Sequence, residues 1–267
     1  MGIQFCRKDK YNIDDLISII SILRDKDCGC PWDKEQTHKS IRNCMIEEAY
    51  EVIEAIDTDN RELMLEELGD VLLQVVFHSQ IESETKGFEF GDVCNAISSK
   101  MINRHPHIFG DDKAKTSEEV LSNWDDIKQL EKSQKSYTDT LNGVSKSLPS
   151  LIRSQKLQKR ASRAISDKWD TMECLNEIKS IIAKLEESIA LDSNTTKGQI
   201  GSLLFATALL AQKLNLDAEE CLYSANDGFI EGFSILEDYI KAHNKDISSL
   251  SKDELLYLYK LAVQENE

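Results

Sequence analysis

Five acidic side chains in the first third of the chain have the spacing of a metal site. They are Glu47, Glu48, Glu51, Glu67 and Asp70. At 100° per residue, the first three fall within one arc of a helix, and the last two share one face of the next helical segment. Carboxylates that face one another in a protein interior are unfavourable unless a positive charge lies between them. Oxygen ligands suit a hard divalent cation, so the spacing predicts a Mg2+ site, with Mn2+ as a substitute.

The segment that carries Glu67 and Asp70 is apolar almost all round. Its polar strip continues from these two acids only to Gln74 and His78. A helix of that kind is normally buried. A solvated helix edge is therefore a weak alternative for these two carboxylates, whereas it stays open for the acids of the preceding segment.

Composition excludes several classes of function. The chain has 267 residues, 40% of them hydrophobic and 30% charged, which is typical of a globular protein. Its net charge of −16 argues against nucleic-acid binding, which needs a basic face. No apolar run reaches the length of a membrane span and the N-terminus has no signal-peptide core, so we expect no membrane association. Without a signal peptide, the seven scattered cysteines indicate reduced thiols in the cytoplasm.

The hydrophobic pattern predicts an all-α protein. Only three prolines interrupt long stretches with a 3.6-residue period, and no alternating β pattern persists. The expected helices cover residues 13–24, 40–56, 62–84, 91–102 and 117–134 in the first half. In the second half they cover residues 151–165, 172–189, 197–213, 218–241 and 252 to the C-terminus. We expect a catalytic domain over residues 1–135, a linker over 136–150 and a second domain over 151–267.

The two halves resemble diverged copies of one helical unit. "LGDVLLQVVFHSQ" (68–80) corresponds to "IGSLLFATALLAQ" (200–212), which places Gln199 and Ser202 opposite Glu67 and Asp70. The apolar frame is retained in the second half, but its acids are gone. We therefore assign the chemistry to the first half and expect the second to pack, dimerise or regulate.

Four segments together resemble the MazG family of nucleoside triphosphate pyrophosphohydrolases. They are "LRDKDCGCPWDKEQTHKSIRNCMIEEAYEVIEAI", "ELGDVLLQVVFHSQ", "RHPHIFGDD" and "VLSNWDDIK". The resemblance implies an all-α, usually dimeric enzyme that hydrolyses NTPs and dNTPs to monophosphates and diphosphate with Mg2+. In some members the C-terminal domain is catalytic; this chain departs there, because its C-terminal acids are absent.

The resemblance and the spacing together suggest a role for each acid. We expect Glu48, Glu51, Glu67 and Asp70 to hold Mg2+, and Glu47 to orient or deprotonate the attacking water.

Further residues are candidates for binding the nucleoside triphosphate substrate. Lys100 and Arg104, one helical turn apart, are expected to hold phosphate oxygens, although a pair that compensates the helix dipole is an alternative. Trp124 resembles a family position near the nucleotide, and a core tryptophan is an equally good interpretation. Trp32 either stacks on a base or covers the core. Lys34 and Gln36, beside it, are further candidate contacts.

Other functions stay open at this point. A narrower dUTP, dCTP or phosphoribosyl-ATP pyrophosphatase, or a protein that senses nucleotides without hydrolysing them, would show the same acids. A di-metal redox bundle normally needs Glu-x-x-His pairs, which are missing here. One copy of the repeat offers too few helices to enclose its apolar faces. We therefore expect tandem MazG-like domains in a four-helix arrangement that a homodimer completes.

Overall fold

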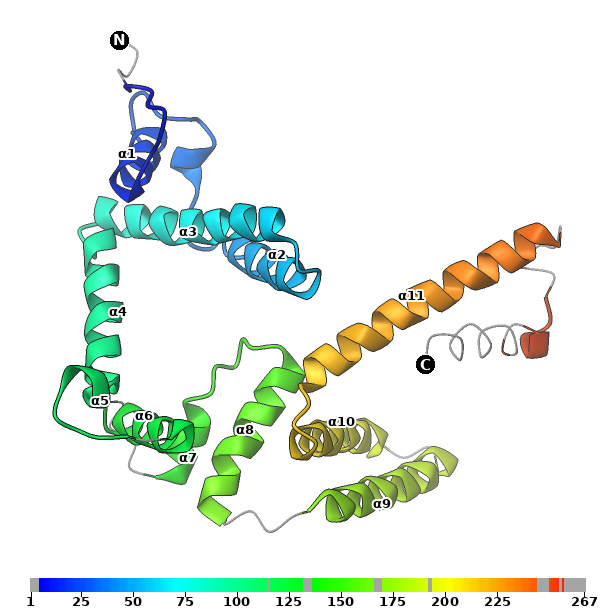
Figure 1. Cartoon of the computed structure of the whole chain (residues 1–267). Coiled ribbons are helices and arrows are strands. Elements are labelled where there is room, and N and C mark those ends of the chain that lie inside the picture. The colour runs from blue at the N-terminus through cyan, green and yellow to red at the C-terminus, as the bar shows by residue number, and fades with distance from the viewer. Residues whose placement is uncertain are drawn as a thin grey trace. The chain divides into compact units, whose positions relative to one another are not determined.

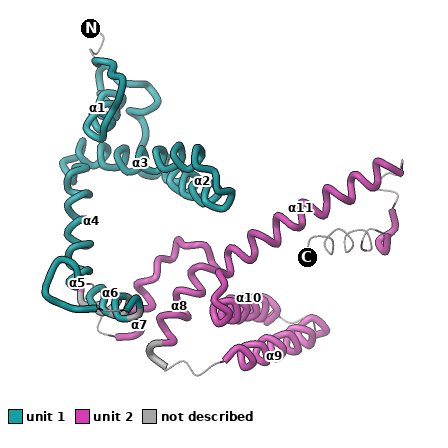
Figure 2. The backbone as a smooth tube through the Cα atoms, viewed as in Figure 1, with its two compact units in different colours: residues 1–128 teal, residues 129–267 magenta. Residues whose placement is uncertain are grey.

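The chain folds into helices, as the sequence predicts. The computed structural model describes residues 5–114, 116–131, 136–165, 170–191, 194–243, 250–254 and 256, and among these it contains no β-strand. It divides into two units, residues 1–128 and 129–267 (Figure 2). Within the described part we find no helix with the length and hydrophobicity that a bilayer crossing requires.

The helices of each unit follow one another along the chain (Figure 1). The first unit contains α1 (Ile13–Leu23), the 3-10 turn η1 (Asp33–Glu35), α2 (Cys44–Asp57), α3 (Arg61–Glu84), α4 (Phe90–Arg104), α5 (Pro106–Phe109) and α6 (Ser117–Glu131), whose last residues pass into the second unit. The second contains α7 (Tyr137–Asn142), α8 (Ser150–Ile165), α9 (Thr171–Ala190), α10 (Thr196–Lys213) and α11 (Ala218–Ala242).

A tight helical hairpin brings the two acidic segments together. Only three residues separate α2 from α3, and Asp59 among them has a positive φ of 49°, a conformation that Asp tolerates better than most residues. Asn60 caps α3 by accepting a hydrogen bond from the Leu63 amide at 3.1 Å. The short connection makes the two helices antiparallel neighbours, so the acids of α2 face those of α3.

The core of the first unit lies at the other end of α3. Ile20 from α1, Ile41 from the loop before α2, and Val76 and Phe77 from α3 form a buried cluster. This packing fixes α1 and the loop of residues 24–43 against the C-terminal half of α3. The carboxylates of α3 therefore lie on the N-terminal half of a helix whose C-terminal half packs in the core.

The second unit contains a comparable hairpin of α9 and α10, against which α8 packs. Two glutamines of α8 fasten it there. Gln155 donates to the carbonyl of Leu216 at 3.0 Å, and Gln158 donates to the carbonyl of Phe205 at 2.6 Å. The two helices that the sequence comparison pairs, α3 and α10, are each the second helix of a hairpin.

Several helix limits differ from those expected. Helix α2 begins at Cys44 rather than at residue 40, because Thr37 and Ser40 bond to each other's backbone in a turn. The short helices η1, α5 and α7 were not predicted, and α7 lies within the expected linker. Most of the helix expected from residue 252 lies outside the described residues. The expected domain limits stay a prediction.

Candidate metal centre

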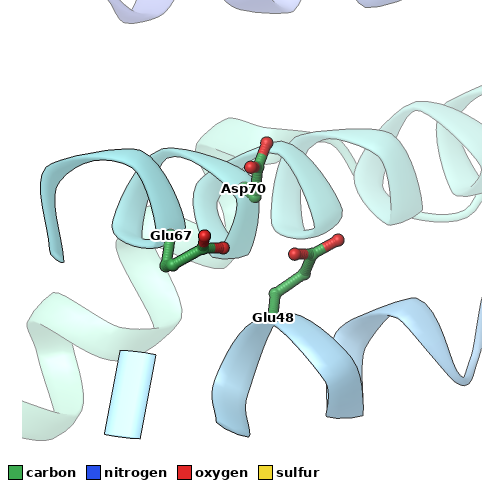
Figure 3. Close-up of side chains that lie close together, drawn as sticks. All are labelled: Glu48, Glu67 and Asp70. Carbon is green, nitrogen blue, oxygen red and sulfur yellow. The ribbon is translucent and has the colours of Figure 1, made fainter. Parts of the chain in front are cut away.

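Three carboxylates from the α2–α3 hairpin converge in the structure. Each of Glu48, Glu67 and Asp70 offers an oxygen, and the three oxygens lie within 4.8 Å of one another (Figure 3). Glu67 is buried, with 7% of its surface exposed, while the other two are half-buried. The i and i+3 spacing of Glu67 and Asp70 places both on the side of α3 that faces α2, as predicted.

Glu51 extends this cluster, and Glu47 does not take part in it. The Glu51 side chain is exposed and lies outside the group of three, but it approaches Glu48 and Glu67 closely enough to raise the pKa values of both. Glu47 is exposed on α2, so its role toward the attacking water stays a prediction.

The crowding of acids raises two pKa values. Burial, followed by the hydrogen bond and the charge of Glu51 and by the charge of Asp70, raises the pKa of Glu67 from its ordinary 4.5 to about 7. Burial and the charges of Asp70 and Glu51 likewise raise the pKa of Glu48. The cluster therefore retains protons when nothing positive lies within it.

The donor set fits a hard divalent cation. Every ligand oxygen in the cluster belongs to a carboxylate, and Mg2+ binds oxygen at about 2.0–2.1 Å, so ligands on opposite sides of it lie roughly 4 Å apart. The separation of at most 4.8 Å among Glu48, Glu67 and Asp70 needs only a small contraction to reach this geometry. Zn2+ or redox iron would favour His or Cys ligands, and this set of described residues contains neither.

A buried arginine fixes the loop that precedes α2. Arg24, at the end of α1, has a side chain only 4% exposed. Its Nε and Nη2 donate to the two carboxylate oxygens of Glu84 at 2.7 and 2.8 Å, which lowers the pKa of Glu84. Its Nη1 donates to the carbonyls of Asp33 and Gln36 at 2.5 and 3.1 Å. One guanidinium therefore ties both ends of η1 to the end of α3.

Two histidines attach the same loop at a second point. The rings of His38 and His78 stack at 5.0 Å with their Nδ1 atoms 2.7 Å apart, and His38 Nε2 lies 2.9 Å from a carboxylate oxygen of Glu82. Burial and the neighbouring His38 lower the pKa of His78. A hydrogen bond between the two Nδ1 atoms requires a proton on one of them.

The structure gives different environments to the three candidate residues of this loop. Trp32 is 60% exposed, so the interpretation that it covers the core is wrong. The amide of Gln36 is bonded within the loop, since its Nε2 donates to the Trp32 carbonyl and its Oε1 accepts from Ser40, both at 2.8 Å. Gln36 thus braces the loop. Lys34 is exposed and its Nζ lies 3.5 Å from the Lys26 carbonyl.

The other candidate substrate residues lie on α4 and α6. Lys100 is exposed on α4. Arg104, the last residue of α4, is buried with its guanidinium 5.7 Å from the centre of the Trp124 ring. The His105 ring lies nearly perpendicular to the same ring, with 5.0 Å between the two ring centres. The structure thus pairs Arg104 with Trp124, in an arrangement in which both contribute to packing.

Within one chain these residues do not surround the carboxylates. At 1.5 Å per residue, Glu84, which anchors the loop, lies roughly 20 Å along α3 from Asp70. Helix α4 then leaves that end of α3 (Figure 1), and Arg104 is roughly 20 Å farther along α4 from its first residue. A single chain does not bring the loop and α4 to the carboxylates. The substrate-binding roles assigned to their residues therefore stay predictions.

Arg24 and the His38–His78 pair organise the loop, and neither was predicted to do so from the sequence. Their residue types could have drawn attention to them, because an Arg at the end of a helix and two histidines occur in segments that contain other functional candidates. Their partners lie about 40 and 60 residues away, and spacing along the chain cannot reveal such pairs.

The second unit has a cavity in place of the acids. It measures about 530 Å³ and lies between α9 and α10. Its lining residues are mainly small or apolar: Glu177, Ile181, Gly198, Gly201, Ser202, Phe205, Ala206 and Leu209. One carboxylate among these eight residues does not make a cation site.

The comparison with protein families matches the segment that carries these carboxylates. The model of the MazG nucleotide pyrophosphohydrolase domain matches residues 36–109, which include the whole α2–α3 hairpin. The nucleoside triphosphate pyrophosphohydrolase of Escherichia coli (strain K12) is 39% identical, over 89% of this chain and 92% of that protein. The nucleoside triphosphate pyrophosphohydrolase/pyrophosphatase MazG of Thermotoga maritima is 37% identical, over 91% and 92%. The chain therefore belongs to the MazG family of nucleotide pyrophosphohydrolases and is a hydrolase of that family.

Proposed function

We propose that the chain is a Mg2+-dependent nucleoside triphosphate pyrophosphohydrolase with its active site at the α2–α3 carboxylates. The observation that carries this proposal is the convergence of Glu48, Glu67 and Asp70 within 4.8 Å. The names of its relatives support the choice of a nucleoside triphosphate as substrate.

In the proposed reaction, water attacks a phosphorus atom of the triphosphate and the bond between the α- and β-phosphates breaks. The products are a nucleoside monophosphate and diphosphate. The cation supplies charge compensation for the phosphates and polarises water. Glu48, Glu51, Glu67 and Asp70 hold it, and Glu47, on the exposed side of the same α2 turn, orients the water or accepts its proton.

Neutral substitutions of the ligands test the site. We expect Glu67→Gln and Asp70→Asn to lower the rate of diphosphate release by roughly a thousandfold or more, because Lewis-acid stabilisation is worth several kcal/mol. Glu66→Gln is the matched control, since Glu66 is an exposed acid directly before Glu67 on α3. Its rate should stay within about twofold of the parent rate. Near-normal turnover in Glu67→Gln would remove this carboxylate from the site.

A panel of NTPs and dNTPs separates the remaining alternatives. A broad pyrophosphohydrolase releases diphosphate from several of them, whereas a specialist acts on dUTP, dCTP or phosphoribosyl-ATP alone. A protein that only senses nucleotides would bind them with Mg2+ or Mn2+ and release no diphosphate.

We also propose that the chain acts as a homodimer. Two apolar stripes of the hairpin are exposed in one chain: Ile46, Tyr50 and Ile53 on α2, and Leu65, Leu68 and Leu72 on α3. The expectation that α3 is wholly buried is thus wrong for a single chain, because α2 covers only one side of it. Both stripes have the spacing of a helix-bundle contact and lie roughly 160° around their helices from the acids. The two stripes therefore lie on opposite outer sides of the hairpin, and a second copy that packs against both sides would cover them without covering the carboxylates.

The dimer can be tested by light scattering on a sizing column. We expect the parent chain to elute with twice its 30.3 kDa mass. Leu68→Lys places a charge in the proposed contact and should shift the mass toward one chain. A monomeric parent chain with full activity would contradict the proposal.

A further inference from the structure

Gln74 lies on α3 beside the carboxylates, one turn after Asp70. It is buried, with 8% of its surface exposed. Its amide lies beside the carboxylate of Glu48 and favours the charged form of that group, as an N–H that faces a carboxylate does. Its other polar atom, Oε1, is also buried and has no hydrogen-bond partner.

The free oxygen of Gln74 has to lie close to the acids. Nε2 and Oε1 share one carbon atom, and this amide group lies beside Glu48. A buried carbonyl oxygen without a partner is unfavourable, and such an exception in a folded protein calls for an explanation. The neighbouring His78, one turn farther on, does not provide the partner, since its Nδ1 is bonded to His38.

A water bound to a cation would supply the missing partner. Mg2+ usually keeps several of its waters when carboxylates bind it, and those waters are strong proton donors. An amide oxygen accepts a hydrogen bond without adding a further negative charge to four acids.

We propose that Gln74 is a positioning residue of the metal centre: its Nε2 orients Glu48, and its Oε1 accepts a hydrogen bond from a water on the cation. The inference rests on the proposed function, because it requires a cation at the α2–α3 carboxylates. The second unit agrees with it: the position aligned with Gln74 is Ala206, and the acids aligned with Glu67 and Asp70 are absent there too.

Metal affinity measured without nucleotide tests the role of Gln74. Gln74→Met removes both polar groups and keeps the length of the side chain. We expect it to bind Mn2+ about 10- to 100-fold more weakly than the parent chain in calorimetric titration, the usual effect of losing a residue that orients a ligand. Gln74→Ala, as a second variant, should show the same loss.

Gln158→Met is a matched control. Gln158 is equally buried, at 6% exposure, and its Oε1 also lacks a partner, but it lies on α8 in the second unit and contacts no acid of the cluster. Its Mn2+ affinity should stay within about twofold of the parent value.

The remaining outcomes distinguish a failure of this inference from a failure of the proposed metal centre. Equal Mn2+ affinity in the parent chain and in both Gln74 variants would overturn the role of Gln74 alone. An equal loss in Gln158→Met would make the effect one of general stability and would also overturn it. A parent chain that binds no Mn2+ would overturn the proposed metal centre together with this inference.

Discussion

Replacing Arg24 by Met should destabilise the first unit and release the loop before α2. The guanidinium is 4% exposed and makes two hydrogen bonds to Glu84 and two to backbone carbonyls of the loop. Removing one partner of a buried ion pair costs about 3–5 kcal/mol, because the other charge is left without compensation. The Glu84 side chain is 25% exposed and can be partly hydrated, so we expect the lower end, about 3 kcal/mol.

Urea unfolding followed by circular dichroism measures this loss in the free energy of unfolding, and thermal unfolding measures the matching change in Tm. For a unit of this size, about 3 kcal/mol corresponds to a fall in Tm of roughly 10 °C. Hydrogen exchange of the amides in residues 30–40 should be faster in Arg24→Met. Arg24→Lys keeps the charge but cannot reach the carboxylate and both carbonyls at once, so the loop should still exchange faster.

Arg42→Met is the control for loss of a positive charge, because Arg42 is exposed in the same unit. Its effect on the free energy of unfolding should be below about 0.5 kcal/mol. A loss below about 1 kcal/mol in Arg24→Met, or unchanged exchange in the loop, would refute the argument that the guanidinium holds the loop.

Three further predictions concern the site. Trp32→Ala should raise KM with little change in kcat if the exposed ring binds the nucleotide in ground and transition states alike; a fall in kcat at unchanged KM would contradict that role. Without divalent metal, thermal stability should fall as the pH rises from about 4.5 to about 7, because the unfolded chain releases the Glu67 proton while the folded chain retains it. Mg2+ should flatten this slope, and identical profiles in EDTA and in Mg2+ would count against a cation there. Glu177→Gln, in the cavity of the second unit, should leave diphosphate release unchanged; a large loss would move the chemistry to that unit.

The sequence alone determined the helical class, and it singled out the acids of the proposed metal centre. Periodicity of 3.6 residues identifies the long helices, and the i, i+3 spacing of Glu67 and Asp70 already fixes that they share a face. The loss of acids in the second half was equally readable, because a repeat provides its own comparison. These features depend on the spacing of residues that are close in the sequence, so they can be read without the tertiary structure.

Only the tertiary structure decided which groups meet across elements. It brings Glu48 to the carboxylates of α3 and leaves Glu47 exposed, because the rotation of α2 about its axis is set by packing against α3. It pairs Arg24 with Glu84, 60 residues away, and uses the Gln36 amide inside a loop. It also separates Arg104 from the acids within one chain, since a straight helix carries its last residue away from its first. Distances between elements depend on how the helices pack, which spacing along the sequence does not encode.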